Sequence, residues 1–258
     1  MKICFLTTIV SSNDYPTDTP GKFNPFGNYD FFLFTNLSKE KFKDSKGWTI
    51  IKMDDSLLNT YIKKNDLDDK KSNIYKSRYI KFMGWKYLKD ILHKDYDVIF
   101  YCDSCYIPNH LMDWNHYANI IIKSESGIIQ RLHDKKHGPK KECMNIVRSK
   151  KDTRENMNKL ISFLIENNCK DKKITENTSF GYNPKNKKIT DAFSNFWNIY
   201  ITQKISYRDQ PLWGLISQKH NINPEFIDIL HRVNGGNKHI MFNFAGKNFS
   251  KNKKRPYI

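Results

Sequence analysis

The sequence predicts an α/β fold in which a central sheet of buried strands is flanked by helices. Two observations carry this prediction. Residues 98–101 form a short apolar, β-prone run without helical spacing, which is typical of a buried strand. Residues 77–92 repeat apolar side chains at the i, i+3, i+4 spacing of a helix that buries one face. A helix directly before a buried strand is typical of α/β proteins.

Composition narrows the class of protein. A chain of 258 residues is one large domain or two small ones, and 38% hydrophobic with 14% aromatic residues indicates a folded protein. The formal net charge of +17 suits an anionic substrate and raises nucleic-acid binding as an alternative. The lysines are spread along the whole chain, however, and no nucleic-acid recognition motif is present. We therefore expect no nucleic-acid partner.

Cysteine usage and hydropathy indicate a location. Five scattered cysteines do not form a disulfide framework, which favours a reducing compartment. The first apolar run is too short for a signal peptide, and no apolar stretch approaches membrane-spanning length. We expect a soluble, cytoplasmic protein without a transmembrane segment.

The first half of the chain is predicted to alternate strands and loops before its helix. We expect strands at residues 2–10, 29–35 and 48–53, and a mobile surface segment at residues 54–73. The helix at residues 77–92 follows, and its apolar face comprises Ile80, Met83, Gly84, Tyr87, Leu88 and Ile91. If this helix packs on the next strand in a βαβ-like unit, then Arg78 and Lys81 lie at the carboxyl edge of the sheet. Basic residues in a first turn oppose the helix dipole, which suggests a use beyond helix stability; an ordinary solvated face is the equal alternative.

Asp103 ends the strand at residues 98–101 and is the first candidate for chemistry. In open α/β sheets ligands bind at the carboxyl edge, and a carboxylate there can hold a divalent cation that carries a diphosphate. The alternative is a strand that ends in a turn-forming Asp. Cys102 and Cys105 form a C-x-x-C pair, but a second pair is absent and a redox pair would open a helix, so zinc binding and redox chemistry are both disfavoured.

The second half of the chain is predicted as a further alternation of strands and helices. We expect a strand pair within residues 120–132, a helix at 152–167 opened by a capping box of Asp152 and Glu155, a strand at 174–182, a helix at 190–203, a helix with Pro211 in its first turn, and a Lys- and Asn-rich tail from Gly235.

Three further residues in this half are candidates. His133 and His137 are spaced as helical metal ligands, but Gly138 and Pro139 break any helix there. A loop pair that contacts substrate, or two surface histidines, is therefore favoured. Asp209 is either a cap of the helix that follows or an active-site carboxylate.

The order of these motifs resembles that of a glycosyltransferase-like family. The family includes plant mucilage-related proteins and bacterial and viral polysaccharide enzymes, long known as a domain of unknown function. The resemblance covers about residues 75 to 220 and rests on SRYIKFMGWKYLKDILHKDYDVIFYCDSCYIPN, the basic His-containing loop, ITENTSFGYNP and SYRDQPLW. The matching positions are Arg78, Lys81, Asp103, His137 with Lys140 or Lys141, Glu176, Asn177, Arg208, Asp209 and Gln210.

The resemblance implies a GT-A fold with a mixed Rossmann-like sheet, in one domain over residues 1–258. Residues 1–110 would bind a nucleoside-diphosphate sugar, and residues 111–258 would bind a glycan or glycoconjugate acceptor and carry the basic tail. The implied activity is that of a hexosyl- or deoxyhexosyltransferase in polysaccharide biosynthesis, in the host cytoplasm if the protein is viral.

The resemblance also implies residue roles. The implied donor-binding residues are Thr8, Arg78, Lys81, Asp103, Ser104 and Cys105. The implied acceptor-binding residues are His133, His137, Glu176, Asn177, Arg208 and Gln210. Asp209 would act as the base for the acceptor hydroxyl in an inverting enzyme, or as a positioning group in a retaining one. Asp103 would hold Mn²⁺ or Mg²⁺ against the diphosphate.

Two departures from the family pattern bear on these roles. Cys105 stands where the family has Asp or Asn, and a thiolate is a poor ligand for a hard cation. Metal binding would then rest on Asp103 with His231 or His239, or Lys and Arg would neutralise the diphosphate without metal. The basic loop has Lys in place of Arg, and Val147 and Arg148 stand where an acid is frequent. These departures leave a catalytically silent glycan- or nucleotide-sugar-binding relative as the main alternative.

Overall fold

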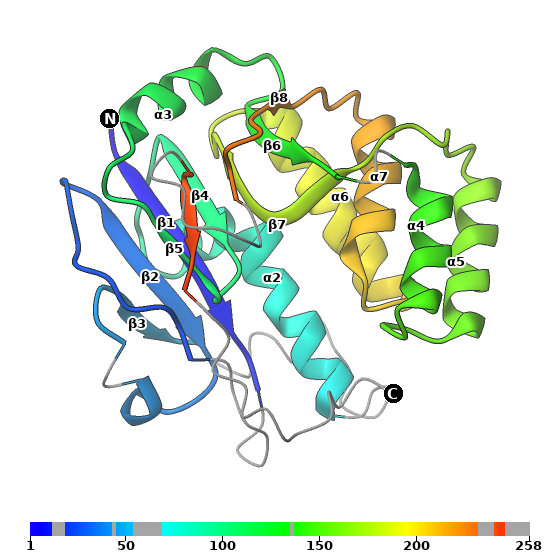
Figure 1. Ribbon diagram of the computed structural model, residues 1–258, viewed down its shortest axis with the longest axis horizontal. Coiled ribbons are helices and arrows are strands. Elements are labelled where there is room, and N and C mark those ends of the chain that lie inside the picture. Colours follow the sequence, from blue (N-terminus) through cyan, green and yellow to red (C-terminus); the bar gives the residue numbers. More distant parts are fainter. Residues whose placement is uncertain (12–18, 43–44, 54–68, 135–136, 232–239, 246–258) are drawn as a thin grey trace.

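The computed structural model describes residues 1–11, 19–42, 45–53, 69–134, 137–231 and 240–245, with residues 69–71 described by their backbone alone. Its centre is a mixed seven-stranded sheet with helices packed against it (Figure 1). The predicted α/β fold with a mixed central sheet flanked by helices is therefore confirmed. A separate two-stranded ribbon joins residues from the middle and the end of the chain.

The main sheet contains a single reversed strand. From one edge to the other its strands are β3 (Thr49–Lys52), β2 (Asp30–Thr35), β1 (Ile3–Ile9), β4 (Val98–Cys102), β7 (Thr175–Tyr182), β6 (Ile128–Leu132) and β8 (Glu225–Phe226). Neighbouring strands pair in parallel except at β7, which is antiparallel to both β4 and β6. The carboxyl ends of β1, β4 and β6 therefore share one edge with the amino end of β7.

Helices and the small ribbon cover the two faces of this sheet. The remaining elements are η1 (Lys39–Phe42), α2 (Asp69–Asp90), α3 (Trp114–Lys123), α4 (Pro139–Arg148), α5 (Arg154–Glu166), α6 (Lys187–Gln203), α7 (Asp209–Lys219) and the ribbon strands β5 (Tyr106–Pro108) and β9 (Phe242–Phe244). The core on one face of the sheet contains residues of α2, α4, α5, α6 and α7. The core on the opposite face contains residues of η1, α3 and β9.

Burial on both faces explains the apolar strands. Every residue of β1 and β4 is buried, so side chains on both sides of these strands meet packed neighbours. On the α3 face the ring of Phe5 lies 4.9 Å from Phe31, 5.4 Å from Phe100 and 4.7 Å from Trp114, measured between centroids. Such aromatic packing fixes β4, and with it the position of the residues that follow this strand.

The structure corrects the start of the long helix. Helix α2 begins at Asp69 rather than Ser77, about two turns earlier. Residues 54–68 of the predicted surface segment lie outside the described residues, but residues 69–73 are helical. The reason is tertiary packing, because Tyr75 is 2% exposed and its ring centroid lies 4.6 Å from that of Tyr200 of α6. Ile91, expected on the buried face, follows the end of the helix and is exposed.

Residues 120–132 are not a strand pair. Helix α3 covers residues 114–123, with Asp113 as its N-cap, and β6 begins only at Ile128. The buried residues Trp114, Ala118 and Ile121 follow a spacing of four and three, which is helical. The apolar run at its carboxyl end was ambiguous between helix and strand.

Two predicted caps are also corrected. Thr153 caps α5 by accepting a hydrogen bond from Asn156 N, whereas Asp152 accepts one from Ser206 Oγ at 2.6 Å. Asp209 is the first residue of α7, and Arg208 occupies the N-cap position without a side-chain cap. Asp209 is therefore not the cap residue.

Candidate active site

The shared sheet edge brings distant parts of the chain together at Asp103. This residue directly follows β4, and its backbone N–H donates to Thr178 O of β7 at 2.9 Å. Thr8 lies near the carboxyl end of the neighbouring β1, and Glu176 lies near the amino end of β7. The residues predicted from the first and second halves of the sequence thus meet along one edge.

Four charged side chains, which we call the Asp209 cluster, form the centre of this edge: Arg78, Lys81, Asp103 and Asp209. Lys81 Nζ lies 3.1 Å from Asp209 Oδ2 and 3.5 Å from Asp103 Oδ1. Arg78 Nε lies 3.5 Å from the same Asp209 oxygen. The side chain of Lys81 is 3% exposed and that of Asp103 is 38% exposed. The cluster therefore combines a buried lysine, Lys81, with a carboxylate, Asp103, that solvent can reach.

Helix α2 supplies the basic residues from its interior turns. The α2 start at Asp69 places Arg78 and Lys81 beyond the first turn, so the predicted opposition to the helix dipole does not apply. Lys81 instead extends over the ring of Tyr101, 5.3 Å from its centroid. The hydroxyl of Tyr101 donates to Asp103 Oδ1 at 3.1 Å, which orients the exposed carboxylate.

Asp209 enters the cluster from the first turn of α7. A carboxylate in a first helical turn is stabilised by the helix dipole. Burial alone would raise the pKa of Asp209, but Lys81, Arg78 and Arg208 outweigh burial and hold that pKa below its ordinary range. Burial likewise disfavours charge on Arg78, but Asp209 together with Tyr200, Asp103 and Tyr101 outweighs burial, so the pKa of Arg78 is raised. Asp209 therefore stays ionised and is a weak base, which suits positioning better than proton abstraction.

A second polar network lies on β6 and β7. Arg131 Nη1 donates to Glu176 Oε2 at 2.9 Å, and His231 Nε2 lies 2.5 Å from the same oxygen. His231 Nδ1 lies 2.7 Å from the hydroxyl of Ser179. Burial would raise the pKa of Glu176, but His231 and Arg131 lower it below its ordinary value.

Amide side chains continue this network toward α7. Gln130 Nε2 donates to Asn177 Oδ1 at 3.3 Å, and Trp213 Nε1 donates to Gln130 Oε1 at 3.2 Å. Gln210 Nε2 donates to the backbone oxygen of Thr175 at 3.0 Å, which ties the start of α7 to β7. Among the described residues, the Asn177 Nδ2 atom is buried without a hydrogen-bond partner.

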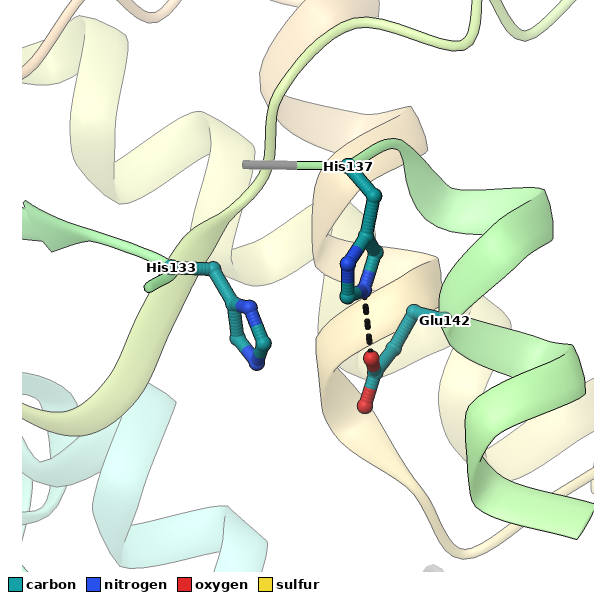
Figure 2. A group of neighbouring side chains, drawn as sticks. All are labelled: His133, His137 and Glu142. Carbon is teal, nitrogen blue, oxygen red and sulfur yellow. Dashed lines mark hydrogen bonds and ion pairs between the residues drawn. The ribbon is translucent and has the colours of Figure 1, made fainter. Parts of the chain in front are cut away.

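His133 and His137 come close together with a residue that the sequence did not single out. Their ring centroids lie 4.7 Å apart, and His137 Nε2 lies 2.6 Å from Glu142 Oε2 (Figure 2). Asn145 Nδ2 is 3.3 Å from the same histidine nitrogen. Burial is the main cause that lowers the pKa of His133. We call His133, His137 and Glu142 the histidine cluster.

The remaining predicted donor residues line the turn after β4 or the end of β1. Ser104 is buried and its carbonyl accepts from Gly21 N at 3.4 Å, while the carbonyl of Cys105 accepts from Ala245 N at 2.8 Å. Thr8 Oγ1 is buried and, within the described part of the chain, has no hydrogen-bond partner. Cys102 faces the core with its pKa raised by burial, and all five cysteines are free.

Among the described residues, those around Asp103 offer few oxygen ligands for Mn²⁺ or Mg²⁺. These hard cations take several oxygen ligands, whereas Cys105 offers sulfur. Both ring nitrogens of His231 are engaged by Ser179 and Glu176, and His239 lies outside the described residues. Within the described ranges, the one group of His, Cys, Asp and Glu whose ligand atoms could share an ion is the histidine cluster.

Sequence reasoning missed three residues that shape this edge: Tyr101, Arg131 and Glu142. Tyr101 was assigned only to the strand core. Arg131 precedes His133 by two positions. Because side chains alternate along a strand, this spacing could have predicted that Arg131 lies on the same face as His133. Pro139 favours a first helical position, which would have placed Glu142 one turn into a helix beside His137.

One comparison with known proteins bears on the fold of this chain. No protein-family model matches the sequence, and no curated protein gives a significant match. Among solved structures, mouse xyloside xylosyltransferase 1 in its apo form matches with a TM-score of 0.51 and 9% sequence identity, over 95% of this chain and 97% of that chain. This chain therefore has the fold of a GT-A glycosyltransferase. Among the helices of the described residues, none is both long and apolar enough to cross a membrane.

Proposed function

We propose that the protein is a glycosyltransferase that moves a sugar from a nucleoside-diphosphate sugar to a glycan or glycoconjugate acceptor. The observation that carries the proposal is the Asp209 cluster, in which residues of α2, β4 and α7 meet at the carboxyl edge of the sheet. That edge is where open α/β sheets bind their ligands. The fold shared with a xylosyltransferase supports the same reaction class. The likeness to the mucilage and polysaccharide enzymes rests on the order of short motifs.

The donor diphosphate would bind beside Asp103, with Thr8, Ser104 and Cys105 lining its site. In the reaction, the bond between the anomeric carbon and the diphosphate breaks and negative charge grows on the departing group. Lys81 and Arg78 would stabilise that charge, since their positions are already fixed by Asp209. Asp209 would thus act as a positioning group rather than as the base.

A resident Mn²⁺ or Mg²⁺ ion at Asp103 stays a prediction. The described residues supply one suitable carboxylate, which leaves the ion short of protein ligands. The proposed mechanism therefore places charge neutralisation on Lys81 and Arg78.

The acceptor would bind along the second half of the same edge. Glu176 and Asn177 lie at the amino end of β7, and Arg208 and Gln210 lie at the start of α7. Gln210 joins these two groups through its bond to Thr175. The Nδ2 atom of Asn177 is buried and unpaired among the described residues, so a side-chain rotation would be needed before it could donate to an acceptor oxygen. His133 and His137 would extend this acceptor side.

Ligand binding is the first test of the proposal. Melting temperatures are measured with a panel of nucleotide sugars and nucleoside diphosphates, each with Mn²⁺, Mg²⁺ or EDTA. We expect at least one nucleotide to raise the melting temperature, because a ligand of the folded state stabilises it by mass action. Sugar transfer to an acceptor glycan is then followed by mass spectrometry. Failure of every nucleotide to bind would overturn the proposal.

Two variants locate the donor site. Lys81→Met should weaken binding of the stabilising nucleotide by about tenfold or more, because a charge-assisted hydrogen bond contributes about 1.5–3 kcal/mol. Lys159→Met is the matched control, since Lys159 is exposed and forms an ion pair with Glu155 of its own helix. Asp103→Asn reports on metal: it should abolish any Mn²⁺-dependent gain in affinity and leave binding in EDTA intact. Equal effects of the two lysine variants would place the nucleotide elsewhere.

The rival function is a catalytically silent nucleotide-sugar or glycan binder, favoured by the thiol at position 105 in place of an acid. Such a protein would bind nucleotide sugars without releasing nucleoside diphosphate. Turnover by the wild-type protein that Lys81→Met reduces and Lys159→Met does not would exclude it.

A further inference from the structure

The histidine cluster is built from two separate elements that meet at one point. His133 follows β6, and Glu142 lies on α4 one turn after its Pro139 start. Figure 2 shows the three side chains converging on one space between the end of β6 and the start of α4. The side chain of His137 is 3% exposed and that of Glu142 is 11% exposed. The cluster thus places two imidazoles and one carboxylate in a largely buried position.

Backbone bonds to a single residue hold both histidines. His133 N donates to Ile174 O at 3.0 Å, and Ile174 N donates to His137 O at 3.0 Å. Glu142 N donates to Gly138 O at 3.0 Å, which closes the first turn of α4. The backbones of the two histidines are therefore both tied to Ile174, and such anchoring helps to preorganise a ligand set.

We propose that His133, His137 and Glu142 bind one borderline divalent cation of the Zn²⁺ class. Two imidazoles with one carboxylate are an established ligand set for zinc, and imidazole suits Zn²⁺ better than Mg²⁺ or Ca²⁺. Three protein ligands leave the fourth tetrahedral position to water or to an oxygen of a bound molecule. This site is separate from the metal position considered at Asp103.

The separations of the ligand atoms bracket the value that a tetrahedral ion needs. Ligand bonds of about 2.0 Å place neighbouring ligand atoms about 3.3 Å apart. The ligand atoms of the three residues all lie within 4.8 Å of one another, and His137 Nε2 lies 2.6 Å from Glu142 Oε2. Metal binding would replace the proton shared by His137 and Glu142, and it would require shifts that side-chain rotation can supply.

Local charge favours a cation although the whole chain is basic. Glu142, Glu176 and Asp134 all act electrostatically on His133. Arg131 pairs with Glu176 and Asp134 and offsets part of this field. Glu142 pairs with His137, which carries charge only when protonated. A divalent ion would balance the charge of Glu142 directly.

Metal titration of the purified full chain tests the proposal. After chelator treatment, Co²⁺ is added as a spectroscopic probe and Zn²⁺ binding is measured by calorimetry. We expect one ion per chain, a visible Co²⁺ spectrum typical of tetrahedral nitrogen and oxygen ligands, and no displacement by excess Mg²⁺. His133→Ala, His137→Ala and Glu142→Gln should each weaken binding by about 10–100-fold or more.

Variants of a histidine and a cysteine outside the cluster test whether other side chains bind the ion. His116→Ala removes an exposed histidine of α3, and Cys105→Ser breaks the C-x-x-C pair. Both should leave the affinity and the spectrum unchanged. Glu142→Gln can keep a hydrogen bond to His137, so it tests the ligand without removing a packed side chain. Absence of binding at one ion per chain, or loss of binding in the Cys105 or His116 variant alone, would overturn the proposal.

The metal site and the transferase proposal can fail separately. Metal titration uses no nucleotide, and nucleotide binding is measured with Lys81→Met, a residue outside the histidine cluster. A protein that binds nucleotide but no Zn²⁺ would keep the proposed function and lose the metal site.

Discussion

The Asp209 cluster and the histidine cluster lie on the same edge of one sheet but balance charge differently. In the first, a buried carboxylate forms ion pairs with both a lysine and an arginine. In the second, a buried carboxylate meets imidazoles whose charge depends on protonation. The first cluster is already paired within the protein, whereas the second gains a full counter-charge only from a proton or a bound cation.

This difference separates positioning from binding. A carboxylate fixed by two cations holds them where a phosphate can use their remaining donors, at the cost of its own basicity. A carboxylate beside imidazoles keeps ligand character, because carboxylate and imidazole both offer lone pairs to an ion. The same edge can thus supply one anion-binding region and one cation-binding region.

The largest expected effect comes from breaking the Asp209 cluster. Asp209→Asn leaves Lys81 and Arg78 close together without their shared counter-charge, and we expect the free energy of unfolding to fall by about 3 kcal/mol. Asp191→Asn, at an exposed position of α6, is the control and should change it by less than about 0.5 kcal/mol. Urea denaturation at pH 7 gives both values. Equal stability of the two variants would show that the buried ion pairs contribute nothing.

The dependence on pH tests whether Asp209 is ionised as proposed. Its folded-state pKa is lowered from the ordinary value of 3.8, so the unfolded chain takes up a proton at a higher pH than the folded protein. The stabilisation is therefore complete above that ordinary value and is lost as pH falls below it. The stability difference between wild type and Asp209→Asn should be constant above about pH 5 and shrink toward pH 3. A difference that grows on acidification would contradict the assignment.

Substitution of two glycines, Gly84 and Gly214, perturbs two different regions of the fold. A Cβ on Gly84 would lie 2.7 Å from Leu6 Cδ1, at the contact of α2 with β1. A Cβ on Gly214 would lie 2.7 Å from Pro139 Cγ and 2.8 Å from Ile174 Cγ2, beneath the scaffold of the histidine cluster. Each substitution to Ala should cost about 1–3 kcal/mol through overpacking.

The two glycine variants should differ in what they bind. Gly214→Ala should weaken Zn²⁺ affinity, because it displaces the residues that hold the two histidines, while Gly84→Ala should leave that affinity unchanged. Calorimetry on both variants, below their melting temperatures, measures the two Zn²⁺ affinities. If both lose Zn²⁺ affinity equally, the loss reflects general destabilisation rather than the scaffold.

The fold was largely readable from the sequence because its strongest signals are local. The strands at β1, β2 and β4 are apolar on both faces, and α6 shows a clear helical repeat. The meeting of Arg78 and Lys81 with Asp103 also followed from a simple topological rule about the carboxyl edge. Each strand and helix signal lay within a short stretch of sequence.

The errors arose where tertiary contacts override local composition. The polar start of α2 is helical because Tyr75 packs on α6, a contact invisible in the sequence window. Glu142 escaped notice because His133, the other histidine of its cluster, follows β6 and comes beside α4 only in the folded chain. The orientation of Asp103 by Tyr101 depends on a hydroxyl at the end of a core ring, and apolar patterning treats that ring only as core.

The smallest expected effect tests that last contact. Tyr101→Phe keeps the buried ring beneath Lys81 and removes the one hydroxyl that donates to Asp103 Oδ1. Loss of one hydrogen bond contributes about 1 kcal/mol, so nucleotide affinity should fall about fivefold while Zn²⁺ affinity stays constant. Tyr117→Phe on α3, at the opposite face, is the control. Unchanged nucleotide affinity in Tyr101→Phe would mean that the direction of the Asp103 carboxylate does not matter for the donor, and the role of this edge would then rest on Lys81 and Arg78 alone.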